Sequence, residues 1–218
     1  MNVQEQAQAL AKKFVKLYPD AHCELCYSNP LELLVATILS AQCTDVRVNQ
    51  VTPLLFQRCK TVEEYALIPQ EELEQIIHST GFFRNKATAI RKTAAALLER
   101  HAGKIPQSLA DLSALPGVGR KTANVVLSNV FEIHEGVVVD THVGRLSQRL
   151  ALTRHHQPVK IEQDLMKLFP QKNWGILSHW LILHGRRRCY ARKPDCTNCE
   201  LRSLCPSVDQ PDKLLKKN

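Results

Sequence analysis

Apolar side chains recur along most of the chain at the spacing of three and four residues that gives a helix one buried face. Prolines and glycines divide this pattern into separate helical segments. A short run of apolar residues at 136–139 carries the strand-like signal of the chain. The expected helices span 3–17, 31–39, 46–57, 62–65, 71–77, 86–101, 109–114, 120–130, 143–150, 161–168 and 174–183. The sequence therefore predicts an all-α fold.

A tight turn precedes the helix expected from residue 120. It reads Leu115-Pro116-Gly117-Val118-Gly119-Arg120-Lys121. The proline ends the preceding helix, and both glycines permit a positive φ and leave no Cβ in the way of an approaching backbone. The unpaired amides at a helix start, together with the helix dipole, favour an anion. We expect the turn to bind a phosphate, although such turns also serve as plain connections between helices.

Lys121 lies in the first turn of that helix, beside Arg120. The helix dipole and the neighbouring cation disfavour a protonated amine there, and a cation at a helix start does not help stability. One interpretation is that Arg120 and Lys121 only contact phosphate. The other is that Lys121 is a partly neutral amine that attacks an electrophilic carbon, as a Schiff-base lysine does.

Asp140 follows the run 136–139 and precedes Thr141. An aspartate in this position is typical of an N-cap, here for a helix that begins at Thr141. A carboxylate anchored at a helix start also has a fixed position, which is useful where a cation develops during a reaction. The two roles are compatible, so the cap is expected and the catalytic role stays open.

Four cysteines near the C-terminus are spaced as C-x6-C-x2-C-x5-C. They are Cys189, Cys196, Cys199 and Cys205. So many thiols in a short segment are typical of one metal centre. Structural zinc usually takes two close pairs, and this segment holds one C-x2-C. Two disulfides are the other alternative, which a cytosolic chain without a secretory signal disfavours. The spacing favours an iron–sulfur cluster ahead of zinc.

These features together resemble the endonuclease III family, bifunctional DNA glycosylases and abasic-site lyases of the helix-hairpin-helix superfamily. The resemblance runs from about Leu31 to Pro206. It rests on stretches that agree in order and spacing: 39–45, 81–87, 115–127, 139–143, 184–186 and the cysteine quartet. Agreement in order and spacing over six stretches is too specific to arise by chance.

The resemblance implies a helix-hairpin-helix DNA glycosylase fold of two helical domains, with an active cleft between them and a 4Fe–4S cluster loop at the C-terminus. One domain is expected at 26–133, with the helix-hairpin-helix at about 107–132. The other is expected at 1–25 plus 134–218. The four cysteines of the quartet are the expected ligands of the cluster.

The resemblance also implies roles for site residues. Lys121 is the expected nucleophile and Asp140 assists it; a lysine predicts strand cleavage in addition to base release, because an iminium acts as an electron sink. Gln42 would fill the gap left by an extruded nucleotide, and Phe82 would wedge the opposite strand. The expected DNA contacts are Gln42, Phe82, Leu115, Gly117, Gly119, Arg120, His142 and Arg186. For Gln42 the alternative is a polar helix terminus, for one of Phe82 and Phe83 it is core packing, and for His142 and His184 it is a buried, hydrogen-bonded ring.

Composition agrees with this interpretation. The chain has 218 residues, and 29 Lys and Arg against 21 Asp and Glu give a net charge of +8, which suits a polyanionic partner. Five cations crowd around the first cysteine of the quartet, where they could rest on a phosphate backbone: Arg186, Arg187, Arg188, Arg192 and Lys193. No apolar stretch is long enough to span a bilayer. We expect a cytoplasmic, nucleoid-associated monomer whose tail from Asp212 is disordered and whose other cysteines are reduced thiols.

The expected substrate is duplex DNA with oxidised or ring-saturated pyrimidines or abasic sites. Two alternatives stay open. The first is a monofunctional glycosylase that uses activated water, in which Lys121 only contacts phosphate. The second is a non-enzymatic DNA-binding or redox-sensing module that keeps the hairpin and the cluster without catalysis.

Overall fold

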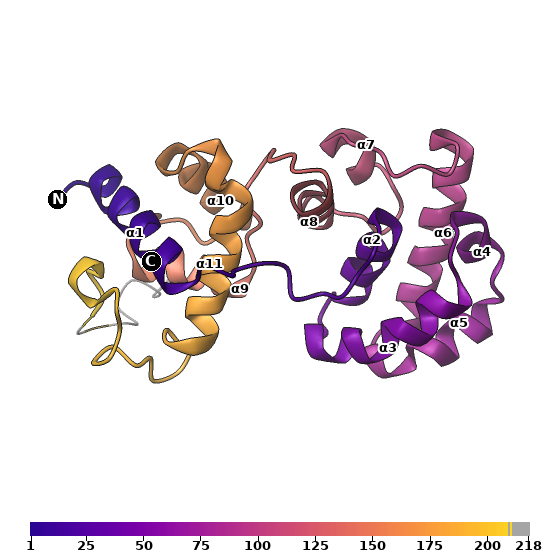
Figure 1. Ribbon diagram of the computed structural model, residues 1–218, viewed down its shortest axis with the longest axis horizontal. Helices are drawn as coiled ribbons and strands as arrows, with labels where there is room; N and C mark the ends of the chain where they lie inside the picture. The colour runs from indigo at the N-terminus through magenta and orange to yellow at the C-terminus, as the bar shows by residue number, and fades with distance from the viewer. Residues whose placement is uncertain (209, 211–218) are drawn as a thin grey trace. The chain divides into compact units, whose positions relative to one another are not determined.

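The computed structural model describes residues 1–208 and 210, and the predicted disordered tail from Asp212 lies outside them. Within that range the regular elements are all helices, so the predicted all-α fold is confirmed. They are α1 (Val3–Leu17), α2 (Pro30–Leu39), α3 (Asp45–Arg58), α4 (Val62–Leu67), α5 (Gln70–Ile77), η1 (His78–Thr80), α6 (Phe83–His101), α7 (Leu109–Ser113), α8 (Arg120–Val130), α9 (Thr141–Arg149), α10 (Pro158–Leu168), η2 (Gln171–Asn173), α11 (Trp174–Arg187) and η3 (Arg202–Leu204) (Figure 1).

The chain forms two compact units. One holds Glu24–Ile133, and the other holds Met1–Cys23 together with the described residues from His134 onward. That these units are independently folding domains, at the limits predicted from the resemblance, stays a prediction. Across residues 1–208 and 210, no helix is both long enough and apolar enough to cross a membrane.

The unit Glu24–Ile133 is built around α2, in which every residue of 33–39 is buried. The helix begins where Asn29 accepts a hydrogen bond from an amide of the first turn and Pro30 sets the first helical φ. Helices α3, α6 and α8 all pack against α2 (Figure 1). A helix surrounded in this way must be apolar on nearly all sides, as α2 is.

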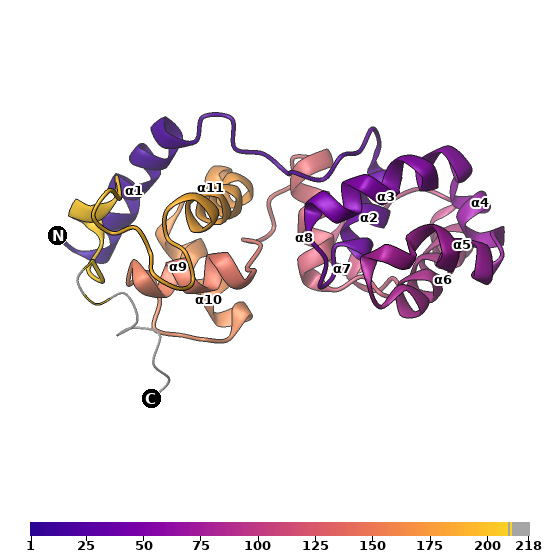
Figure 2. The same cartoon turned by 90° about the horizontal axis from the view of Figure 1, so that it is seen from below.

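The other unit joins the first helix of the chain to the last ones. Helix α1 lies beside α11 (Figure 2), where the ring of Phe14 stacks on that of Trp180 with centroids 5.9 Å apart. Gln6 Nε2 donates to the carbonyl oxygen of Leu150, at the end of α9, at 2.9 Å. The N-terminal helix therefore completes a core that α9, α10 and α11 begin.

The strand-like signal at 136–139 was wrong. This segment begins with a bend at Gly136, continues without regular structure, and forms no strand in the described part of the chain. Val137 and Val138 are buried against helices, and the carbonyl of Val138 accepts a hydrogen bond from Ser178 Oγ of α11 at 2.9 Å. An apolar β-branched run forms a strand only where a partner strand is available, and in this unit helices bury the run instead.

Several helices extend further than the pattern predicts, among them α6 and α11. Helix α6 begins at Phe83 instead of residue 86, because Phe82 takes a left-handed φ of 49° and its carbonyl accepts the amide of Lys86. Helix α11 continues to Arg187 instead of residue 183. Its last turn carries Arg186 and Arg187, cations that the negative end of the helix dipole favours.

Candidate functional site

The turn before α8 packs closely against α6. Gly117 has a φ of +78°, and a Cβ added there would lie 2.7 Å from the Cβ of Ala89. Gly119 has an extended backbone with a φ of −86°, and a Cβ there would meet open space. Of the two glycines, both of which permit a positive φ, only Gly117 takes one. At Gly119 the missing side chain only improves access. The Leu115 side chain is buried, so Leu115 offers a ligand only its main chain.

The start of α8 is open to an anion. Its N-cap is Gly119, and no side chain caps the first turn. The first two helical residues, Arg120 and Lys121, are both exposed. Uncapped amides, the helix dipole and two cations give this end of the helix a positive potential. The arrangement can hold a phosphate next to a primary amine.

Two exposed turns of the same unit carry the residues expected to enter DNA. Gln42 and Phe82 both adopt a left-handed backbone, with φ of 52° and 49°. Gln42 is exposed and the Phe82 side chain is 63% exposed. Phe83 is half-buried instead, with its ring centroid 4.5 Å from that of His78, so it is less exposed than Phe82 but not part of the buried core. Left-handed φ at residues other than glycine is unfavourable and typical of functional turns.

Asp140 caps α9, as predicted: its Oδ1 accepts a hydrogen bond from the amide of Val143 at 2.7 Å. His142 is half-buried, and its Nδ1 lies 3.3 Å from Arg145 Nη2. Burial lowers the pKa of His142, against the opposing effect of the Asp140 carboxylate, and the charges of Arg145 and Arg186 lower it further. Arg186 is exposed at the end of α11. The structure therefore brings Asp140, His142 and Arg186 together on one unit.

His184 is the buried, hydrogen-bonded histidine that the sequence allows. It is 2% exposed, with Nδ1 2.9 Å from the hydroxyl of Tyr18 and Nε2 3.5 Å from the sulfur of Cys199. Burial lowers the pKa of its imidazole to about 4. A neutral, enclosed ring cannot meet a phosphate at the surface, so His184 supports the fold beside the cysteines.

The four C-terminal cysteines line one small pocket, together with buried leucines of α9 and of the C-terminal segment. All eight cysteines are free, so the disulfide alternative was wrong. Among residues 1–208 and 210, no three Cys, His, Asp or Glu side chains are grouped so that they could hold one metal ion. Thiols spread around a void suit a cluster in which each iron takes its own thiolate. The residues present therefore fit an iron–sulfur cluster better than a single zinc ion.

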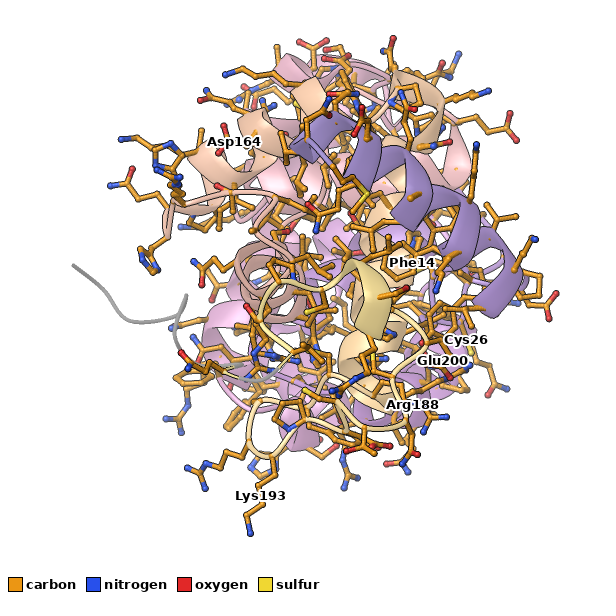
Figure 3. All side chains as sticks on the ribbon, turned by 90° about the vertical axis from the view of Figure 1, so that its left-hand side faces the viewer. Phe14, Cys26, Asp164, Arg188, Lys193 and Glu200 are labelled. Atoms are coloured by element: carbon orange, nitrogen blue, oxygen red, sulfur yellow. The ribbon has the colours of Figure 1, made fainter. Side chains whose placement is uncertain are left out.

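The basic residues of the cysteine segment divide into two groups. Arg188 donates to Glu200 at 3.2 Å and to Asp195 at 3.4 Å, so neighbouring carboxylates offset its charge. Lys193 is exposed and points away from the body of its unit (Figure 3), and Arg192 is exposed as well. The expectation that all five cations face a phosphate backbone therefore needs correction at Arg188.

Two buried cations were not predicted from the sequence. Arg149 of α9 is 1% exposed and donates to the sulfur of Cys189 at 3.3 Å and to the carbonyl of Tyr190 at 2.6 Å. Lys86 of α6 is 5% exposed and donates to two carbonyl oxygens. Each lies on the apolar face of its helix, between positions that the periodicity assigns to the core. A charge in register with a buried face is the signal that could have identified both.

Comparisons with known proteins agree with this geometry. Residues 35–171 match the family model described as "HhH-GPD superfamily base excision DNA repair protein". Endonuclease III of Synechocystis sp. is 57% identical over 193 residues, which cover 88% of each chain. The chain belongs to the endonuclease III family. It is accordingly a base excision repair enzyme, a DNA glycosylase and abasic-site lyase, and the predicted family and enzyme class are confirmed.

Two solved structures of the family extend the comparison. A non-covalent endonuclease III–DNA complex superposes with a TM-score of 0.90 at 45% identity, covering 95% of this chain and 97% of the other. A trapped endonuclease III–DNA covalent intermediate gives the same TM-score and identity, covering 95% and 98%. The predicted helix-hairpin-helix glycosylase fold is therefore confirmed.

Proposed function

We propose that the chain excises oxidised and ring-saturated pyrimidines from duplex DNA and then cleaves the abasic strand through a Schiff base on Lys121. The observation that carries this proposal is the exposed Lys121 amine one residue inside an uncapped helix start. Phosphate held by that helix start would bring a sugar of the same strand beside the amine. The phosphate contact therefore does not discriminate between bases, and the Lys121 amine carries out the reaction.

The reaction begins with base release. The lone pair of Lys121 Nζ forms a bond to C1′ as the glycosidic bond breaks. The base leaves with the electron pair of the glycosidic bond and gains a proton, and the attached nitrogen loses a proton. The sugar ring then opens: the nitrogen lone pair forms the C=N bond while O4′ takes a proton. Both steps develop positive charge at C1′. We assign Asp140 the stabilisation of this charge, because its side chain is fixed by the cap of α9.

Strand cleavage uses the iminium as an electron sink. Loss of a C2′ proton forms the C1′–C2′ enamine, and expulsion of the 3′ phosphate then breaks the C3′–O bond. Water hydrolyses the unsaturated imine and releases Lys121. A hydroxyl nucleophile at this position could not provide the nitrogen lone pair that these steps need.

The base must leave the helical stack before C1′ can be reached. We propose that Gln42 fills the gap that the extruded nucleotide leaves and that Phe82 wedges into the opposite strand. Both side chains are exposed on tight turns. Pyrimidines that have lost planarity stack poorly, so their extrusion costs less than that of an intact base. The lower free-energy cost of extruding a poorly stacked base would make the enzyme select ring-saturated pyrimidines.

Further contacts with duplex DNA are assigned to exposed cations. Arg120 lies at the start of α8, while Arg186, Arg192 and Lys193 lie at the end of α11 and in the cysteine segment. Such contacts bind phosphate without reading base sequence, and they make affinity fall steeply with salt.

We also propose a 4Fe–4S cluster on Cys189, Cys196, Cys199 and Cys205. Because all four of its irons would be bound by protein thiolates, the cluster would offer no open coordination position to a substrate. Its role would be to cross-link the four cysteines and so hold the C-terminal segment in place. Arg149 donates to the sulfur of Cys189, and this hydrogen bond would orient and stabilise a thiolate. Metal analysis of the purified protein should find iron, and zinc in its place would contradict the proposed cluster.

Borohydride trapping on a duplex with one abasic site tests the nucleophile. The wild-type protein should form a covalent DNA adduct, and Lys121→Gln should form none. Arg120→Gln is the matched control, because it removes one positive charge from the same helix turn and leaves the amine in place. The control should bind DNA more weakly yet still form the adduct. An adduct with Lys121→Gln would refute the assignment, and equal loss in both variants would reduce Lys121 to a phosphate contact.

Substrate class is tested separately with duplexes that differ in one base. A ring-saturated thymine should be released much faster than thymine, and 8-oxoguanine should be a poor substrate. Release of 8-oxoguanine at a rate equal to that of the saturated thymine would contradict the pyrimidine assignment without affecting the Schiff base.

A further inference from the structure

A buried ammonium group connects two turns of the unit Glu24–Ile133. Lys86 lies in the first turn of α6 and is 5% exposed. Its Nζ donates to the carbonyl oxygen of Leu39 at 2.7 Å and to that of Thr80 at 2.8 Å. Both acceptors belong to the main chain, so the bonds fix backbone positions and not side-chain rotamers.

Each acceptor ends the element that leads into one of the exposed turns. Leu39 is the last residue of α2, and Gln42 follows it by three residues. Thr80 is the last residue of η1, and Phe82 follows it by two. The ammonium therefore bridges the starts of the two turns, and both turns then take a left-handed φ.

The bridge is electrostatically expensive for the fold. Burial lowers the pKa of Lys86, which shows that the interior disfavours its charged form. No carboxylate pairs with it in the described part of the chain; its partners are carbonyls at helix ends, where the helix dipole is negative. An apolar side chain would fill the same space without this desolvation. What only the ammonium provides is two directed bonds to two separate turns.

The same helix also fixes the hairpin. Thr93 Oγ1 donates to the carbonyl oxygen of Pro116, and Ala89 is the residue that a Cβ at Gly117 would strike. Lys86, Ala89 and Thr93 are spaced by three and four residues, so they share one face of α6. This face contacts the two turns and the phosphate-binding turn at once.

We propose that Lys86 is a positioning residue that holds the Gln42 and Phe82 turns at a fixed separation, so that both side chains enter the duplex together when a nucleotide is extruded. The inference rests on the proposed roles of Gln42 and Phe82. Lys86 touches no DNA itself. Its effect should appear only in steps that require extrusion.

The first test compares a substrate that needs extrusion with one that does not. Lys86→Met should slow base release from a ring-saturated thymine in duplex DNA about ten- to a hundredfold, the range expected for losing charge-assisted hydrogen bonds. Borohydride trapping on a single-stranded abasic oligonucleotide should change less than about twofold, the usual limit for independent sites. Equal losses on both substrates would overturn the positioning role.

A matched control separates positioning from general weakening of the fold. Thr37→Val removes a buried hydrogen bond in the same unit, from Thr37 Oγ1 to the carbonyl of Leu33, which lies within α2 and bridges no turns. This control should keep the duplex rate near that of the wild type. If it slows the duplex reaction as much as Lys86→Met does, the effect is loss of stability and the inference is wrong. Lys86→Gln, which keeps a short donor, replaces Lys86→Met if the latter does not fold.

A mutant cycle shows whether Lys86 acts through the two turns. In a background of Gln42→Ala with Phe82→Ala, Lys86→Met should slow duplex base release by less than about twofold further, because nothing remains to be positioned. A full additional loss would overturn the inference and leave the proposed function standing. If the background variant itself releases the base as fast as the wild type, the proposed DNA-inserting roles fail, and the inference fails with them.

Discussion

Replacing Gly117 with alanine should destabilise the unit Glu24–Ile133 far more than the same change at Gly119, two residues along the chain. A non-glycine residue at the φ of +78° costs about 1–2 kcal/mol. The new Cβ would also lie 2.7 Å from the Cβ of Ala89, and overpacking of this kind typically costs about 1–3 kcal/mol. Gly119 has neither problem, since its φ is −86° and a Cβ would meet open space.

The expected loss for Gly117→Ala is about 2–4 kcal/mol, because the reduced entropy of the unfolded chain returns somewhat less than 1 kcal/mol. Gly119→Ala should cost less, about 1 kcal/mol at most, because alanine is a poorer N-cap for α8 than glycine. It should nevertheless weaken DNA binding, since its Cβ would project where the phosphate approaches. Urea denaturation gives the two free energies of unfolding, and hydrogen exchange of the α6 and α8 amides assigns the loss to this unit.

Ala89→Gly separates the two contributions to the Gly117→Ala loss. On its own it should cost about 1 kcal/mol, as glycine does inside a helix. Combined with Gly117→Ala it should recover the part due to the contact and leave the part due to φ. Additive losses in the double variant would refute the close approach of the turn to α6. Equal stability of Gly117→Ala and Gly119→Ala would refute the whole argument.

Three further outcomes are expected. Tyr65→Phe should raise stability by about 1 kcal/mol, because the Tyr65 hydroxyl is buried without a hydrogen-bond partner within the described residues. Burial raises the pKa of Tyr65, so above pH about 10 the unfolded state binds fewer protons than the folded state, and the free energy of unfolding falls as the pH rises. In urea denaturation at pH 9–11, this free energy should fall less steeply with pH for Tyr65→Phe than for the wild type. An equally steep fall in both would contradict this. Asp140→Ser should keep the cap of α9 and lose turnover, whereas Asp140→Ala should lose turnover and about 1 kcal/mol of stability; full activity of the serine variant would remove Asp140 from the chemistry. Cys205→Ser should remove the visible absorption of a cluster and lower the thermal midpoint of the unit that holds α1 and α11, with Cys26→Ser, an exposed thiol outside the quartet, as the matched control that changes neither.

Periodicity predicted the helices because most of them bury one continuous face. This pattern can be read from the local sequence without knowing which other helix packs against that face. It failed at 136–139, where β-branched residues indicate a strand but helices provide the burial. It also could not show that Phe14 packs on Trp180, because a stripe of apolar residues does not specify which stripe it meets. Long-range pairing depends on the whole chain.

The chemical motifs were easier to find than the residues that support them. Lys121 and the quartet stand out because their residue types and spacing are unusual in themselves. Lys86 and Arg149 lie in register with the buried faces of their helices, but only the fold shows that each is enclosed and bonded to main-chain carbonyls or to a thiol. The distinction between Gly117 and Gly119 likewise needs the neighbouring helix, because only the position of Ala89 makes one of them indispensable.

The packing of α1 against the last helices has a consequence for biosynthesis. The ribosome delivers the whole segment Glu24–Ile133 before any of α9 to α11 exists, so α1 waits as an unpartnered amphipathic helix while that segment is made. Its partners include carbonyl oxygens as late as Leu204, which Gln6 Nε2 reaches at 2.7 Å. The proposed cluster could form only once Cys205, the last of its four cysteines, has been made. A chain arrested near Ile133 would expose a bare apolar helix face to the quality-control machinery of the cell.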